Sequence, residues 1–433
     1  MPLPTELFSG LESDTMAQLP ELRRSLRGRT VLFLSPTPAL SPLLQAQGVP
    51  HMRELAAQFG IRFILFTMEN SARTPAYEQA AAELRNKLAS WGIEWLSMRN
   101  GRMPLFPNST SDVLRGIPQV AHILRSRAVD LVHCRSYVPA FIMLALRPLF
   151  SVPWIFDLRG FYPDELVRDG QWPAASVAHK ASLWLERRSF EFAAATVVVT
   201  DRQHQRLLTR WPRADRARIA VIRNCADTGR FAPNPEMRQL MRRHLGVGPK
   251  PLLVWSASSI RKVHAPLEVL TFAKLCRDAL GSRLLILTRT ADADGMVRAA
   301  GFLAGEYNIV SAEPEKVPAY LNAADAGIAF IVQDHEGPGI KFAEYLAIGL
   351  PVIANGANAE WCGVLRNKRC GVVVNDFSSS EYGRVALSLP SLLAEPGIRE
   401  RCREVALTDY SLEGAVAAYS RLYQRLMAAG FRK

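Results

Sequence analysis

The chain has few of the features that mark secreted, metal-binding or membrane-spanning proteins. Its 433 residues include six cysteines, none in a C-x-x-C pair and none beside a histidine at metal-ligand spacing. This pattern excludes the usual cysteine metal sites. It predicts free, mostly buried thiols in a reducing compartment.

Long apolar runs are also missing. The longest, Phe141–Phe156, is interrupted by Arg147, Pro148 and Pro153, so it cannot span a bilayer. The segment Met1–Leu22 is polar and acidic and lacks the apolar core of a signal peptide. We therefore expect a cytoplasmic protein, and peripheral contact with the inner membrane face stays open.

The charge balance is basic, at +13, in a chain with 48% hydrophobic and 21% charged residues. Such a balance favours anionic partners. A local cluster is formed by Arg23, Arg24, Arg27 and Arg29. We interpret it as a solvated helix face; the alternative is an electrostatic contact with an anionic lipid surface. No known motif interleaves aromatic and basic residues, so we expect no nucleic-acid partner.

Short β-branched apolar runs alternate with longer amphipathic segments, which predicts an α/β protein with parallel sheets. The expected strands of the first half are Val31–Ser35, Arg62–Phe66, Ile93–Ser97, Asp130–His133, Pro153–Asp157, Thr196–Thr200 and Ile219–Ile222. Those of the second half are Leu252–Trp255, Arg283–Thr288, Asn308–Val310, Gly327–Ile331, Pro351–Ala354 and Gly371–Val374. Turn-forming residues separate the two series. We expect a first domain over 1–225, a second over 226–410 and a C-terminal helix over 411–433 that packs back on the first.

The segment EGPGIKFAEYLAIGLPVIA, residues 336–354, is the most informative. A glycine-rich turn leads into a helix from about Ile340 to Ile348, which Gly349 can end in a left-handed conformation. Free N–H groups and the positive end of the helix dipole at this turn suit a diphosphate.

Three side chains of this segment have the right chemistry for a sugar nucleotide. Lys341 adds positive charge in the first helical turn, and Glu344 on the same face can accept both hydroxyls of a ribose. Glu336 can accept hydrogen bonds from sugar hydroxyls. The alternative interpretation is a surface ion pair between Lys341 and Glu344 and a loop carboxylate at Glu336.

This segment resembles the retaining glycosyltransferases of family 4, which have the GT-B fold. Glu336 and Glu344 have the family's E-x7-E spacing, within a matching K-x-x-E-Y-L-A-x-G-x-P-V-I pattern. Residues 317–325 and 221–231 are also similar, although Arg223 and Cys225 replace the family's proline and glycine. The resemblance implies two Rossmann-like domains whose parallel sheets face a central cleft.

The resemblance also implies roles for individual residues. Glu336 contacts the donor sugar, Lys341 and Gly339 bind its diphosphate, and Glu344 binds the ribose. A basic pair, Arg261 and Lys262, fits the place of a second phosphate clamp, with a solvated turn as the alternative. Because these cations and the helix dipole supply the positive charge, we expect no metal ion and no cofactor. The D-x-D at residues 292–294 is interpreted as a loop.

The first domain departs from many relatives, which place a catalytic histidine after one of its strands. Here Asp157 and Arg159 of a D-x-R-G segment stand in that place, which resembles a subgroup of the family. Arg159 could stabilise phosphate charge and Asp157 could orient the acceptor, or the two could be a pair that holds the loop. His133 could substitute for the missing histidine. Gly48 allows close backbone approach in a loop that, in the family, contacts donor phosphates and acceptor.

We therefore expect a retaining, hexosyltransferase-like enzyme that uses a nucleotide-diphosphate sugar. Its acceptor would be a glycan or glycolipid of polysaccharide or glycolipid biosynthesis. The alternative is a catalytically silent sugar-nucleotide-binding protein, motivated by the missing histidine. An NAD-dependent oxidoreductase is disfavoured, because no G-x-G-x-x-G follows a first strand and Phe342 stands where its third glycine would be.

Overall fold

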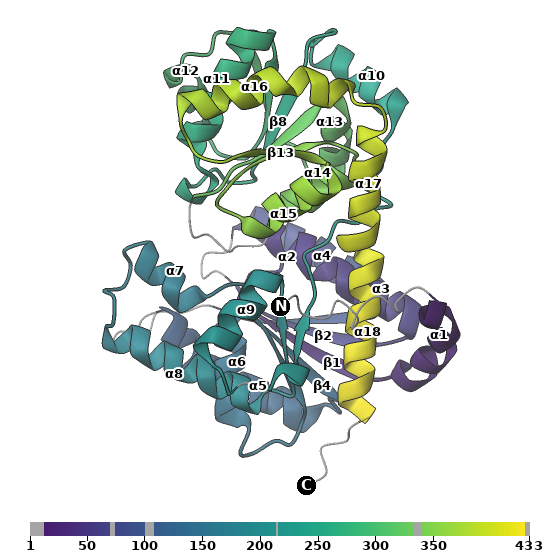
Figure 1. The fold of residues 1–433 in the computed structure, drawn as a ribbon. Helices are drawn as coiled ribbons and strands as arrows, with labels where there is room; N and C mark the ends of the chain where they lie inside the picture. The colour runs from purple at the N-terminus through teal and green to yellow at the C-terminus, as the bar shows by residue number, and fades with distance from the viewer. Residues whose placement is uncertain (1–12, 70–73, 100–107, 214, 333–338, 429–433) are drawn as a thin grey trace. The chain divides into compact units, whose positions relative to one another are not determined.

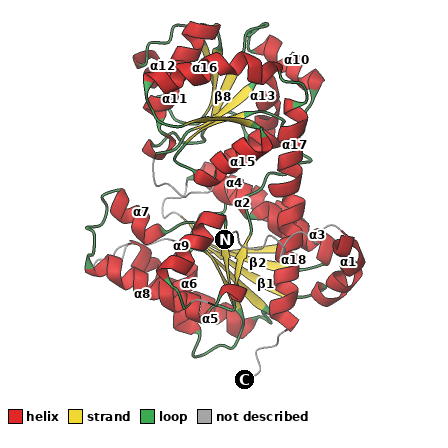
Figure 2. Cartoon of the chain, viewed as in Figure 1, coloured by secondary structure: helices red, strands yellow, loops and turns green. Residues whose placement is uncertain are grey.

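The chain folds into two compact units, each built on one parallel sheet with helices on both faces (Figures 1 and 2). The computed structural model describes residues 13–69, 74–99, 108–213, 215–332 and 339–428. The first unit takes in the described residues of Met1–Val199, His204–Ile222 and Val416–Lys433, and the second those of Thr200–Gln203 and Arg223–Ala415. The last helix therefore joins the first unit for most of its length.

The first sheet has seven parallel strands in the order β3-β2-β1-β4-β5-β6-β7. Its strands are β1 (Thr30–Ser35), β2 (Arg62–Glu69), β3 (Ile93–Arg99), β4 (Leu131–Arg135), β5 (Trp154–Asp157), β6 (Ala195–Val198) and β7 (Ile219–Val221). Most of them are continuous apolar runs because helices cover both faces of the sheet.

The second sheet has six parallel strands in the order β10-β9-β8-β11-β12-β13. They are β8 (Leu252–Ser256), β9 (Arg283–Leu287), β10 (Tyr307–Val310), β11 (Ala326–Ala329), β12 (Val352–Asn355) and β13 (Gly371–Val374). Leu252 and Val254 of β8 pack into one buried cluster, and Leu253 and Trp255 into another. Successive side chains thus enter opposite faces, so each strand supplies both halves of the core.

The helices follow the strands in the alternation that the sequence predicts (Figure 1). Up to the connector they are α1 (Ser13–Leu26), α2 (Pro42–Gln47), α3 (Val49–Phe59), α4 (Pro75–Ser90), α5 (Asn108–Ser126), α6 (Tyr137–Leu146), α7 (Tyr162–Arg168), α8 (Val177–Phe192) and α9 (Asp201–Arg210). The others are α10 (Pro235–His244), α11 (Pro266–Leu280), α12 (Ala293–Ala299), α13 (Val317–Ala323), α14 (Ile340–Ala347), α15 (Ala359–Lys368), α16 (Ser379–Ala394), α17 (Ile398–Asp409) and α18 (Leu412–Ala428).

Every expected strand is present, and the differences lie at the strand ends. β4 continues to Arg135, two residues beyond the expected end, and β11 stops at Ala329 rather than at Ile331. The backbone N–H of Ile331 donates to the Asn355 side chain over 2.9 Å, and its carbonyl accepts from the same amide over 2.8 Å. A side chain has replaced the neighbouring strand there, which a strand-propensity pattern cannot indicate.

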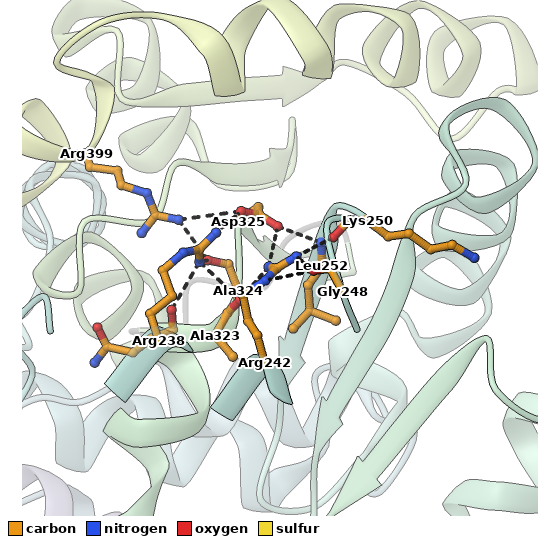
Figure 3. Close-up of polar contacts among 10 residues, drawn as sticks. Arg238, Arg242, Gly248, Lys250, Leu252, Ala323, Ala324, Asp325 and Arg399 are labelled. Carbon is orange, nitrogen blue, oxygen red and sulfur yellow. Dashed lines mark hydrogen bonds and ion pairs between the residues drawn. The ribbon is translucent and has the colours of Figure 1, made fainter. Parts of the chain in front are cut away.

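An arginine cluster braces the second sheet at the amino ends of β8 and β11 (Figure 3). The Asp325 carboxylate pairs with Arg238 and Arg242, lies 3.8 Å from Arg399, and accepts from the Leu252 N–H over 2.8 Å. The same guanidinium groups donate to carbonyls at the end of α13, which would otherwise lack partners. This clamp lies at the sheet edge opposite to the carboxyl ends, where ligands bind in open α/β sheets.

Other expectations about the chain concern its cysteines and helices. All six cysteines are free and buried, as the sequence predicts. Arg23 and Arg24 are exposed near the end of α1. Among the described residues, no helix combines the length and the apolar character that crossing a membrane requires.

Candidate functional site

The second sheet has a topological switch point between β8 and β11. Its order places β9 and β10 on one side of β8, and β11 to β13 on the other. The crevice outside the carboxyl ends of two such strands is the usual ligand site of an open α/β sheet. Arg261 and Lys262 follow β8, while Lys341 and Glu344 follow β11 on α14. The fold therefore brings four predicted donor-site residues to one edge of one sheet.

Gly339 precedes α14 at a point where only glycine fits. A Cβ atom there would lie 2.2 Å from Cζ2 of Trp361. Trp361 in turn stacks on Phe342, with ring centroids 5.0 Å apart. At the other end, Gly349 has φ +78° and its N–H donates to the Leu346 carbonyl, which confirms the expected left-handed end of the helix.

Lys341 and Glu344 form an ion pair on α14, with Nζ 2.7 Å from Oε2. Glu344 is only 4% exposed, whereas Lys341 is partly exposed. The ion pair that the alternative interpretation predicts therefore exists, but the Glu344 carboxylate is buried and the pair is not a surface pair. A buried carboxylate is costly unless it is paired, and Lys341 is the ionic partner of Glu344 in the described chain.

Arg261 and Lys262 lie exposed in the loop after β8, which ends in a 3-10 turn over Lys262–His264. The loop is held in two places: Ile260 N–H donates to Thr290 Oγ1 over 2.8 Å, and Val332 N–H donates to the Val263 carbonyl over 3.0 Å. The second bond ties this loop to the chain after β11. The cations thus stand on a loop that is held to Thr290 and to Val332.

Glu336 lies outside the described residues, together with the other residues of 333–338. Its predicted contact with the donor sugar stays a prediction.

In the first unit, Asp157 is the last residue of β5 and is completely buried. Its Oδ2 atom accepts from Nε and Nη2 of Arg159 at 2.9 and 2.6 Å, and lies 3.1 Å from Nε2 of His133. The predicted Asp157–Arg159 pair therefore exists, and His133 on β4 joins it. Like Asp157, His133 is buried, with 1% of its surface exposed.

Helix α18 completes this cluster with two tyrosines one turn apart. The Tyr423 hydroxyl lies 2.7 Å from Nδ1 of His133, and the Tyr419 hydroxyl accepts from Arg159 Nη2 over 3.3 Å. His51 of α3 lies edge-on to Tyr419, with ring centroids 5.5 Å apart. Segments from both ends of the chain therefore meet at the carboxyl ends of β4 and β5.

Gly48 lies buried between α2 and α3, next to Gln47. The Gln47 side chain accepts from Nη2 of Arg135, the last residue of β4, over 2.9 Å. The predicted Gly48 loop thus reaches the same sheet edge as Asp157.

Burial governs the protonation of this cluster. It lowers the pKa of His51 to about 3, with the Arg159 charge adding to the effect, and it also lowers the pKa of His133. Burial would by itself raise the pKa of Asp157, but the Arg159 charge and the His133 hydrogen bond outweigh it and hold that pKa well below its usual range. At neutral pH the cluster therefore contains an ionised aspartate and neutral histidines.

Sequence reasoning missed Arg135, His51, Tyr419 and Tyr423. A signal existed for Arg135, since a charged residue at the end of an otherwise apolar strand beside another such strand indicates a ligand edge. The tyrosines gave none, because tyrosines at helical spacing are equally typical of a core.

Two other features take no part in these clusters. A cavity of about 530 Å³ in the first unit is lined by residues that include Arg187, Trp211 and Arg218, near the amino ends of β6 and β7. The D-x-D is not a loop throughout, because its last two residues begin helix α12; Asp294 pairs with Arg298 of that helix and accepts from the Tyr307 hydroxyl of β10.

Comparison with known proteins agrees with this architecture. Residues 22–225 match the model of the glycosyl transferase 4-like domain. A D-inositol 3-phosphate glycosyltransferase of Corynebacterium jeikeium is 24% identical over 70% of this chain and 74% of its own length.

Solved structures agree over nearly the whole chain. A glycosyltransferase from Rickettsia africae has a TM-score of 0.70 at 16% identity, covering 92% of this chain and 98% of its own. Anabaena HepE in complex with UDP-glucose has a TM-score of 0.66 at 13% identity, covering 92% and 99%. Together with the parallel sheets of both units, these findings show the GT-B fold, with a first domain that matches the glycosyl transferase 4-like domain.

Proposed function

We propose that the protein is a retaining glycosyltransferase that takes its sugar from a nucleotide-diphosphate donor. The observation that carries the proposal is the burial of Glu344 beside Lys341 at the switch point of the second sheet. An acid placed there only for a surface ion pair would stay in water, where it costs little. Burial within reach of a helix N-terminus instead suits a carboxylate that accepts the hydroxyls of a ribose.

The charges at the same edge support this assignment. Arg261 and Lys262 are exposed cations after β8, and the amide groups that open α14 add the positive end of a helix dipole. Three cations and a dipole match a diphosphate, so the proposal includes no metal ion. The similarity to HepE, whose structure holds UDP-glucose, agrees with a nucleotide-sugar donor.

The reaction we propose is displacement on one face of the sugar. The bond between the anomeric carbon and the diphosphate oxygen breaks, and the acceptor oxygen forms its bond to the same carbon on the same face. The acceptor proton passes to the departing phosphate oxygen. Charge grows on that phosphate in the transition state, so Arg261, Lys262 and Lys341 stabilise the transition state more than the bound donor.

The first unit supplies the acceptor side in this proposal. Asp157 orients an acceptor hydroxyl and Arg159 adds positive charge, while Glu336 contacts the donor sugar. The acceptor is a glycan or a lipid-linked glycan, the latter reached at a membrane surface.

The test is thermal unfolding of the wild type and of Glu344→Ala with a panel of nucleoside diphosphates and their sugars. One base should raise the melting temperature of the wild type by several degrees, because a ligand at 100 times its Kd stabilises by about 2.7 kcal/mol. The increase should vanish in Glu344→Ala. Glu404→Ala, which removes an exposed glutamate of the same unit, is the matched control and should respond like the wild type.

The outcomes separate the candidate functions. No response to any nucleotide at millimolar concentration would rule out the donor site. A response without transfer or donor hydrolysis, across many acceptors, would favour the silent sugar-nucleotide-binding protein. Where transfer occurs, it should continue in EDTA, and NMR of the product should show the donor's anomeric configuration.

A further inference from the structure

The buried cluster of the first unit has an excess of positive charge. Arg135 is 3% exposed, makes no ion pair with any described residue, and donates a hydrogen bond to the neutral Gln47 side chain. Arg159 pairs with the carboxylate of Asp157, the only one that the described residues bring to the cluster. With the histidines neutral, the described part of the cluster therefore holds two guanidinium groups and one carboxylate.

Among the described residues, no further acid compensates Arg135. The carboxylate that acts on its charge is Asp157 alone, and burial with the nearby Arg159 charge lowers the pKa of Arg135 to about 10. The internal segments outside the described residues of this unit, 70–73, 100–107 and 214, contain no aspartate or glutamate in the sequence. A buried, uncompensated guanidinium is expensive, and an anionic ligand would supply the charge that pairs with it.

Two polar atoms of this cluster also lack partners in the described chain. They are Nε of Arg135, a donor, and Oδ1 of Asp157, an acceptor. Arg135 and Asp157 are register partners on the adjacent parallel strands β4 and β5, so their side chains leave the same face of the sheet. A ligand that carries an oxyanion and, close to it, a hydroxyl would satisfy both atoms and balance the charge of Arg135.

The backbone next to Arg135 supports a binding role. Ser136 has φ +71° and ψ −172°, a region that residues other than glycine rarely adopt and that is typical of functional sites. Helix α6 begins at Tyr137, so its positive dipole end lies beside the same guanidinium. Ser136 and Arg159 are partly exposed, which leaves the cluster next to solvent.

We propose that Arg135 and Asp157 form an acceptor subsite for a sugar or polyol that carries a phosphate or carboxylate. The oxyanion accepts from Arg135, and a neighbouring hydroxyl donates to Oδ1 of Asp157. The inference rests on the proposed function, because it names the class of acceptor that the glycosyltransferase uses. In this proposal Arg135 selects acceptors that carry an anionic group, because a neutral sugar has no phosphate or carboxylate for Arg135 to bind.

The test compares glucose 6-phosphate, inorganic phosphate and glucose as probes, at constant ionic strength set with chloride. Affinity is measured by thermal unfolding and titration calorimetry. Glucose 6-phosphate should bind most tightly, phosphate more weakly, and glucose not measurably. Arg135→Gln should weaken glucose 6-phosphate binding about tenfold or more, since it removes a charge-assisted hydrogen bond. Arg24→Gln, which removes an exposed arginine of the same unit, should bind like the wild type.

A double variant, Arg261→Gln with Lys262→Gln, separates the two possible sources of the anion, because these exposed cations belong to the proposed diphosphate site. If the subsite belongs to the acceptor, glucose 6-phosphate still binds this variant, even where nucleotide binding is lost or never seen. Loss of glucose 6-phosphate binding in the double variant would assign the anion to the donor site and overturn the proposal. Equal binding by wild type and Arg135→Gln would overturn it as well.

Hydrogen exchange of the wild type covers the case in which Arg135→Gln does not fold. Bound glucose 6-phosphate should protect backbone amides at the ends of β4 and β5, such as those of Ser136 and Leu158. Protection confined to the second unit would contradict the subsite.

Discussion

At the residue scale, the positions that matter most are those whose local conformation or burial is costly. Ser136 keeps a strained backbone, Arg135 a buried charge, and Glu344 a buried carboxylate. None of these three features helps to form a hydrophobic core. Both proposed binding sites rest on the coincidence of these costs with the carboxyl edges of the two sheets.

Replacing Ser136 by glycine should stabilise the protein. Glycine adopts φ +71° without strain, so the free energy of unfolding should rise by about 1 kcal/mol, after the higher chain entropy of glycine is subtracted. Urea unfolding followed by circular dichroism measures the change. Ser136→Ala keeps the Cβ atom and should give no such gain; an equal gain in both variants would show that the hydroxyl, not the backbone, is responsible.

At the scale of elements, short segments are held in place by side chains that come from far along the chain. Asn355 of β12 binds the backbone after β11, and Trp361 of α15 leaves room only for glycine before α14. The loop after β8 is tied to Val332. These long-range contacts, rather than helix or strand propensity, hold the segments of the proposed donor edge in place.

The arginine clamp at the amino edge of the second sheet should prove structural. Asp325→Asn leaves Arg238 and Arg242 without their carboxylate and should lower the free energy of unfolding by roughly 2 kcal/mol, less than for a fully buried pair because these groups are partly exposed. Chemical denaturation measures the loss, while nucleotide affinity of the folded protein should not change. Asp409→Asn, at an exposed aspartate of the same unit, should change stability by under about 0.5 kcal/mol. An equal loss in both variants would contradict the role of the clamp.

At the scale of the whole molecule, acid should destabilise the first unit through its buried histidines. The folded state holds His51 neutral down to a pKa of about 3, whereas the unfolded chain takes up the proton near the usual 6.5. The stability contributed by the neutral ring is complete above pH 6.5 and falls as the pH drops towards 3. Between pH 7 and pH 5, the free energy of unfolding of His51→Gln should therefore fall by about 2 kcal/mol less than that of the wild type.

Urea unfolding at the two pH values, monitored by hydrogen exchange in the first unit, measures this difference. His133 also has a lowered pKa and stays in the variant, so a smaller pH dependence should persist. His244→Gln, at an exposed histidine of the second unit, should behave like the wild type. An unchanged pH dependence in His51→Gln would contradict the assignment.

The sequence by itself determined the thirteen strands of the described residues and the glycine that ends α14. Each depends on residues close together in the chain, where apolar periodicity and backbone freedom act locally. Lys341 and Glu344 belong to this group, because three residues on a helix fix their spacing.

Only the tertiary structure decided which strands are neighbours, and so which side chains share an edge. Asp157 meets His133 because β4 and β5 pair, and His133 meets Tyr423 because the last helix joins the first unit. The charge excess at Arg135 depends on partners distant in the sequence, such as Gln47 and Asp157. Packing brings these groups together after local patterns have been satisfied, and no local pattern encodes the result.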